Sequence, residues 1–120
     1  MSLEKALLVE KINEEHVALL AELACMVVDA SNERLKPKAL EEVARHWQGH
    51  ILTEERAMKA LGLRAAGHRP LHRSSHESIT KSLGETAKRP SGKGLGALAA
   101  GIVDHILTMD MELIRLLKSE

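Results

Sequence analysis

Apolar residues recur at intervals of three and four along most of the chain, the spacing that places them on one face of an α-helix. Segments with this pattern lie near residues 4–30, 37–61, 70–87 and 94–118. The faces predicted to point inward are, in order, Leu8, Ile12, His16, Leu20, Leu23, Val27 and Ala30; Leu40, Val43, Trp47, His50, Glu54, Met58 and Leu61; His72, His76, Ile79 and Leu83; and Leu95, Leu98, Ile102, His105, Met109, Leu113 and Leu116. The pattern predicts a chain of amphipathic helices.

The breaks between these segments contain proline and glycine. Pro37 suits the first turn of a second helix, because its missing N–H has no helical partner there. Residues 62–70 hold two glycines and a proline, and residues 88–94 combine Gly, Pro and Ser. Helices joined by such short connections favour an up-down-up-down four-helix bundle. At 120 residues, we expect one domain over positions 1–120.

Composition supports an all-α fold and excludes some functions. The chain has one Trp, no Phe and no Tyr, whereas strands favour aromatic residues. Lys plus Arg and Asp plus Glu number 17 each, so no basic surface predicts nucleic-acid binding. The apolar run 94–103 is too short to span a bilayer, and residues 1–5 lack a signal-peptide block, so we expect a cytoplasmic protein without membrane contact. Cys25 is predicted to be a small core residue.

Histidines and a carboxylate interrupt the predicted inward faces. They are His16, the pair His50 and Glu54, the pair His72 and His76, and His105. Residues four apart lie one turn apart on the same helix face, so each pair can point two donors at one place. Burying such groups is costly unless they are paired. Imidazole with carboxylate and no thiolate suits iron, zinc or manganese, so the sequence predicts a metal site inside the bundle.

Asp110 belongs to the same motif but poses a geometric problem. It follows His105 by five residues, which in a regular helix places it about 140° off the same face. A local widening of the turn would bring the two together, and such bulges are frequent at functional sites. We therefore expect a distorted turn between them.

Other titratable residues offer alternatives. His68 with His72 has the same spacing as His72 with His76. We prefer the second pair because Pro70 would start the helix and leave His68 in the preceding loop. His46 lies one turn before His50 and could be a ligand, although an outer or surface role fits its polar neighbours better. The remaining nearby charges are interpreted as solvent-facing: Glu14, Glu15, Glu55 and Asp104.

These motifs, taken together, resemble the hemerythrins, specifically the short bacterial hemerythrin-like domains. The matching stretches are INEEH at 12–16 with Leu19, Leu20 and Leu23; HILTEE at 50–55 with Met58; His72 and His76 with Ile79; and HILTMD at 105–110. The resemblance covers nearly the whole chain. Family members usually have Trp, Tyr and Phe around the site, whereas here Leu, Ile, Met and Trp47 must line it.

The resemblance implies a non-haem di-iron site with an oxo or hydroxo bridge. One iron would be bound by three imidazoles and the other by two, and two carboxylates would bridge them. The implied ligands are His72, His76 and His105 for the first iron, His16 and His50 for the second, and Glu54 and Asp110 for the bridges. By ligand count the second iron has an open position, where dioxygen would bind.

Reversible dioxygen binding, for carriage, storage or sensing, is the function that this resemblance implies. Histidine-rich sites of this kind contrast with carboxylate-rich di-iron bundles. No residue of the set looks like a nucleophile beside a base, so we do not expect an enzyme. The alternatives are reduction of peroxide or nitric oxide at the same irons, or a regulatory bundle that binds zinc or iron.

Overall fold

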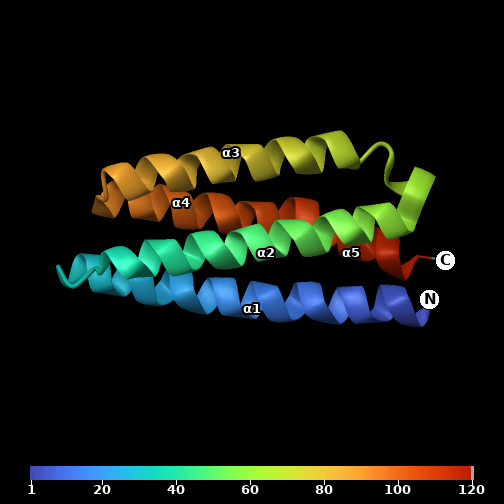
Figure 1. The fold of residues 1–120 in the computed structure, drawn as a ribbon, viewed down its shortest axis with the longest axis horizontal. Helices are drawn as coiled ribbons and strands as arrows, with labels where there is room; N and C mark the ends of the chain where they lie inside the picture. Colours follow the sequence, from blue (N-terminus) through green and yellow to red (C-terminus); the bar gives the residue numbers. More distant parts are fainter. Residues whose placement is uncertain (120) are drawn as a thin grey trace.

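The regular structure of residues 1–119, which the computed structural model describes, consists of helices (Figure 1). They are α1 (Leu3–Ser31), α2 (Pro37–Leu61), α3 (Arg69–Lys88), α4 (Gly92–His105) and α5 (Met111–Lys118). A 3₁₀ turn, Gly62–Ala65, follows α2, and a π turn, Ile106–Asp110, joins α4 to α5. The predicted all-α class is therefore confirmed, and α4 with α5 corresponds to the predicted fourth helix.

The helices pack side by side along one long axis, within an envelope of 48 × 23 × 19 Å (Figure 1). The chain turns from α1 into α2 at one end of the molecule and from α2 into α3 at the other end, where both termini also lie. Helix α1 contacts α2 and α4, and α3 contacts the same two helices. The four long helical segments thus surround a common interior.

Local sequence explains where the helices begin and end. The Ser2 hydroxyl accepts a hydrogen bond from the Lys5 amide (3.2 Å), and the Ser91 hydroxyl caps α4 in the same way through Gly94 (3.0 Å). Helix α2 ends where Gly62 adopts a φ of 60°, a conformation that favours glycine. Each helix begins and ends within two residues of its predicted limits.

The apolar core consists of two clusters with a polar layer between them. One cluster comprises Leu19, Leu23, Met26, Leu40, Val43, Trp47, Ile79, Leu83, Leu95, Leu98, Ile102 and Ile106. The other comprises Val9, Ile12, Ala57, Met58, Leu61, Ala65, Leu113, Ile114 and Leu117. On α1 and on α2 the buried histidine lies between the residues of one cluster and those of the other. This layer is where the candidate site forms.

The inward face of α1 is rotated from the predicted one. Leu19 and Met26 are buried, whereas Leu20 and Val27, predicted to point inward, are each 39% exposed. Cys25 is exposed, so its prediction as a core residue was wrong. Apolar residues occupy adjoining faces of this helix, and a step of one residue turns the face by about 100°. The apolar pattern alone therefore left the buried face ambiguous.

The rotation of the last helix segment also differs from the prediction. Met109 and Leu116 are only partly buried, and Ile114 and Leu117 lie in the core instead. The cause is the π turn Ile106–Asp110, which changes the phase of the helix beyond it.

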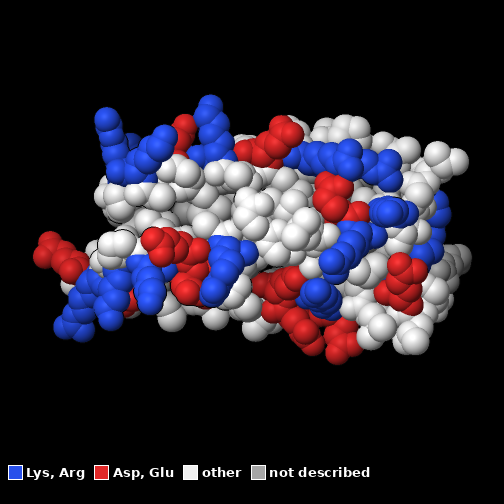
Figure 2. Space-filling view, in the orientation of Figure 1, with Lys and Arg blue, Asp and Glu red and all other residues white. Residues whose placement is uncertain are grey.

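Charges of both signs alternate over the face shown in Figure 2, as expected for a net charge of zero. Within residues 1–119, no helix has an apolar stretch long enough to cross a membrane.

Candidate metal centre

The polar layer brings together every residue that the sequence predicted for the site. Helix α1 contributes one histidine, α2 a histidine and a glutamate, α3 two histidines, and the α4–α5 segment a histidine and an aspartate. These residues are His16, His50, Glu54, His72, His76, His105 and Asp110, and all are buried. Helices distant in sequence thus place their polar residues at one level of the bundle.

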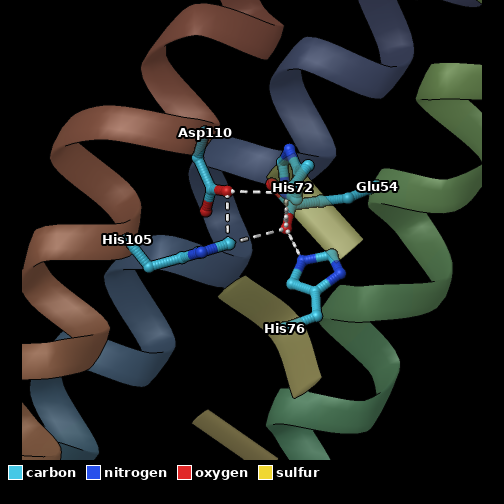
Figure 3. Close-up of side chains that lie close together, drawn as sticks. All are labelled: Glu54, His72, His76, His105 and Asp110. Carbon is cyan, nitrogen blue, oxygen red and sulfur yellow. Dashed lines mark hydrogen bonds and ion pairs between the residues drawn. The ribbon is translucent and has the colours of Figure 1, made fainter. Parts of the chain in front are cut away.

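The seven side chains form two overlapping groups. The first contains three histidines from α3 and α4 (Figure 3), and the second contains two from α1 and α2. Both groups include Glu54 and Asp110. Within each group the candidate ligand atoms lie within 4.8 Å of one another, comparable to the roughly 4.2 Å between two opposite ligands of one transition metal. The shared carboxylates therefore join two places where a metal could bind.

A single carboxylate oxygen is the meeting point of four imidazoles. Glu54 Oε1 lies 2.9 Å from His76 Nε2, 3.1 Å from His72 Nε2, 3.2 Å from His50 Nε2 and 3.5 Å from His105 Nε2. One oxygen has about two lone-pair directions, so it cannot accept four well-directed hydrogen bonds. The nitrogens converge on a small region in the manner of a ligand shell.

Asp110 faces the imidazoles of both groups. Its Oδ2 accepts hydrogen bonds from His16 Nε2 (2.8 Å) and His50 Nε2 (2.9 Å). Its Oδ1 lies 2.7 Å from His105 Nε2 and 3.2 Å from His72 Nε2, yet neither contact has hydrogen-bond geometry. Buried polar atoms rarely lack a partner. The misdirected contacts of Oδ1 suit an atom that shares a metal with these nitrogens.

Two further buried atoms lack hydrogen-bond partners, Glu54 Oε2 and His76 Nδ1. For Glu54 this leaves one oxygen crowded by imidazoles and the other with nothing, which is costly in a site with 0% exposure. A divalent cation would satisfy both oxygens. The unpartnered Glu54 oxygen and the nitrogen–oxygen donor set together fit a metal.

The distorted turn expected between His105 and Asp110 is present. Residues Ile106–Asp110 form a π turn, and the two side chains are 1% and 0% exposed. Because a π turn holds more residues than an α turn, residues five apart come to the same face. Thr108 donates a hydrogen bond to the Asp104 carbonyl (2.7 Å) and so satisfies one carbonyl near the distortion. The prediction of a widened turn is confirmed.

Two imidazoles of the cluster have pKa values shifted in opposite directions. Burial alone would lower the pKa of His50, but hydrogen bonds to Asp110 and Glu15 outweigh it and raise the pKa to about 10. Burial, with repulsion from His72 and other imidazoles, lowers the pKa of His76 to about 3. At neutral pH His50 is therefore a positively charged imidazolium and His76 a neutral imidazole.

The two shared carboxylates also differ. Burial, opposed by a hydrogen bond from His105, raises the pKa of Glu54 well above its ordinary value. For Asp110, burial acts in the same direction, but the close contact with His105 and the hydrogen bonds from His16 and His50 outweigh it and hold the pKa far below its usual range. These shifts favour the ionised form of Asp110 and the protonated form of Glu54. Metal binding would favour the ionised form of both, since metal ligands must be deprotonated.

Glu15 has a role that the sequence did not predict. Its Oε1 accepts a hydrogen bond from His50 Nδ1 (2.8 Å), and its Oε2 accepts one from Thr53 Oγ1 (2.7 Å). The prediction that Glu15 faces solvent was therefore wrong. A carboxylate on the far nitrogen of a ligating histidine fixes its ring orientation and raises its basicity. In the sequence, only the position of Glu15 next to His16 could have indicated this role. Glu14, two residues before His16, has nearly the same position, so the sequence could not distinguish the two glutamates.

Two other imidazoles have partners on their far nitrogens. His105 Nδ1 lies 2.6 Å from the Ser75 hydroxyl, and His72 Nδ1 lies 2.6 Å from His68 Nε2. His68 precedes the first residue of α3 and is outside both groups, on the side of His72 that faces away from Glu54. The structure therefore places His72 and His76 in the cluster and leaves His68 as an outer neighbour.

The remaining candidates lie outside the cluster. His46 is exposed and hydrogen-bonded to Glu22. Glu55 forms a two-pronged salt bridge with Arg73 (2.9 and 2.8 Å) at the surface, and Asp104 is exposed. Glu14 is exposed as well, so the solvent-facing interpretation holds for it and for Asp104.

Trp47, the single Trp, Phe or Tyr residue of the sequence, lines the centre. Its ring centroid lies 5.3 Å from that of His105, 5.6 Å from that of His76 and 5.9 Å from that of His50. The indole N–H donates to Thr80 Oγ1 (3.1 Å), so the buried ring leaves no polar atom unpaired. An apolar cluster thus lies on each side of the layer along the bundle.

Fold and site together define a helical bundle with a buried histidine–carboxylate cluster that could bind metal. Comparisons with protein-family models, with curated proteins and with solved structures give no match to this chain. The hemerythrin resemblance accordingly remains an expectation from the sequence motifs.

Proposed function

We propose that this chain is an up-down-up-down bundle of the hemerythrin type, with a non-haem di-iron centre that binds dioxygen reversibly. The observation that carries the proposal is the pair of overlapping ligand groups that share Glu54 and Asp110. Two carboxylates common to two sets of imidazoles are what a bridged pair of metal ions requires. A single metal would leave one of the two sets unused.

The two groups would hold the irons unequally. His72, His76 and His105 supply three nitrogens to one position, while His16 and His50 supply two to the other. With the same bridging oxygens, the second position has one protein ligand fewer and keeps room for a small ligand. Iron at such a position would supply the reversible electron transfer that dioxygen binding needs.

The chain's own side chains would orient the ligands and exclude water. Glu15 holds the ring of His50 through its Nδ1–H, so that Nε2 faces the second position. The two apolar clusters, one of which contains Trp47, would limit the access of solvent to a metal in the layer between them. Five neutral imidazoles also leave fewer negative charges on the centre than the carboxylate-rich bundles have.

The test is the metal content and visible spectrum of the purified protein. We expect about two irons per chain, with a visible band that changes when deoxygenated protein meets air and returns when oxygen is removed. Glu14→Gln is a control, because this glutamate is exposed and outside both groups. Iron near zero, or zinc in its place, would overturn the proposal. Rapid turnover of peroxide or nitric oxide without a reversible dioxygen spectrum would favour an enzyme.

A further inference from the structure

A separate group of metal-binding residue types lies on the outer side of the α1–α2 pair. It consists of Glu22 on α1 with Glu42 and His46 on α2, and we call it the outer triad. Its candidate ligand atoms lie within 4.8 Å of one another. We propose that the outer triad is a second, solvent-facing site for a divalent cation, independent of the buried centre.

The backbone places the three side chains together. Glu42 and His46 are four residues apart on α2, so both lie on the same face of the helix. Helix α1 packs along α2 and adds Glu22, whose carboxylate accepts a hydrogen bond from His46 Nδ1. Their side chains are 24% (Glu22), 43% (Glu42) and 44% (His46) exposed. Water can therefore complete the coordination of a bound ion.

The donor set determines the kind of ion. One imidazole and two carboxylates, without a thiolate, suit Zn²⁺ or a neighbouring divalent transition metal. Three protein ligands with open positions for water also form the usual shell of an accessible zinc site. Arg45 donates a hydrogen bond to Glu42, and this arginine is the cation's competitor for that carboxylate. A bound metal ion would take the place of the positive charge that Arg45 now presents to Glu42.

The outer triad shares no ligand with the buried centre. Along the same α1–α2 pair, His50 bonds to Glu15 whereas His46 bonds to Glu22. His50 has no exposed surface, and its group includes residues of the α4–α5 segment, which the outer triad lacks. Loading one site therefore does not depend on the residues of the other.

Zinc titration of the full chain, as purified with its own metal, tests the proposal. Equilibrium dialysis against Zn²⁺, with iron measured in parallel, should show about one additional zinc per chain. His46→Ala and Glu22→Gln should each weaken zinc binding by about tenfold or more. Loss of a residue that only orients a ligand already costs about that much, and these two residues would be ligands themselves. Arg45→Ala should tighten zinc binding, because the competitor for Glu42 is gone. Glu41→Gln, an exposed neighbour with the same charge change, should leave it unchanged.

A second measurement separates binding at this site from loss of fold. Zinc should raise the thermal midpoint of the parent protein but not that of His46→Ala, because a ligand that binds only the folded state stabilises it. Metal content of the buried centre should be the same in both. Equal zinc binding by the parent, His46→Ala and Glu22→Gln would overturn the proposal, whatever the buried centre contains.

Discussion

The buried centre and the outer triad use the same residue types on the same helices but differ in solvation. On α2, His50 and Glu54 are four residues apart, and so are Glu42 and His46. The side chains of the first pair have 0% exposure, whereas those of the second pair are 44% (His46) and 43% (Glu42) exposed. Exposed donors are hydrated when no ion is present, but buried donors must find partners within the protein. If the proposed function holds, burial rather than spacing would make a metal essential to one group and optional for the other.

The strongest test of this contrast is removal of one carboxylate from each group. Glu54→Gln preserves side-chain volume but replaces one carboxylate oxygen by an amide nitrogen and removes the charge of a residue that both buried groups share. We expect iron content to fall by more than about tenfold, because loss of a residue that only orients a metal ligand already costs about that much. Glu42→Gln should leave iron unchanged. Elemental analysis of both variants checks this, and parallel loss of iron in the two would contradict the contrast.

Metal removal should affect the two groups differently. Stripping the buried centre leaves several enclosed polar groups with poor partners, at about 1–3 kcal/mol each unless water enters. We expect the thermal midpoint to fall by several degrees, since each kcal/mol corresponds to about 4 °C or more in a domain of this size. Calorimetry of metal-free and metal-loaded protein measures the difference. Coincident midpoints would show that the metal does not hold the core.

The two histidines next to His72 provide a matched pair. His76→Ala removes a nitrogen 2.9 Å from Glu54 and should cost iron and the visible band. His68→Ala removes only an outer contact of His72 and should retain most of the iron. His72→Ala cannot distinguish the two possible pairs, because both contain it. Loss of iron in His68→Ala with retention in His76→Ala would show that the ligands are His68 and His72.

Glu15→Gln tests the carboxylate behind His50. The amide can still accept a hydrogen bond from His50 Nδ1, but it no longer carries the charge that raises the pKa of that imidazole. We expect metal affinity to fall by about 10–100-fold with the fold retained. Competition with a chelator measures the change. Glu14→Gln, one residue away and exposed, is the control and should match the parent.

The pH dependence should be the smallest effect near neutrality. In the metal-free protein, the raised pKa of His50 stabilises the fold fully below its ordinary value of 6.5, and this contribution is lost as the pH rises through about 10. Metal binding has the opposite dependence, because it must displace that proton. Affinity should therefore rise by about tenfold per pH unit for one proton, up to about pH 10. Calorimetry in buffers of different ionisation enthalpy counts the proton, and zero release would contradict the assignment.

The sequence predicted most of the helices and the convergence of the site, because both follow from periodicity. Pro37, Ser91 and Gly62 mark helix ends through local backbone chemistry, and the structure agrees within two residues. Asp110 was placed correctly only by allowing a widened turn, since regular geometry points it elsewhere. Local sequence therefore predicts where each helix begins and ends, but not how each helix is rotated about its axis.

The burial of individual side chains on α1 could not be predicted from the sequence, because it depends on contacts between helices. Cys25 and Glu15 were both assigned to the wrong environment, one too buried and the other too exposed. Helix α1 has apolar residues on adjoining faces, so its rotation is decided by packing against α2 and α4. Glu15 differs from Glu14 only in its reach to His50 and Thr53, thirty-five and thirty-eight residues away.

The π turn has a consequence for how the length of this chain can vary. In a regular helix, deleting one residue turns every later side chain by about 100° and would expose Leu113 and Leu117. Within Ile106–Asp110 the same deletion would instead convert the wide turn into an ordinary one. The aspartate would then follow His105 by four residues and still face inward, and the apolar face of α5 would keep its direction. This turn is therefore the place in the fourth helix where a single-codon deletion is neutral in register.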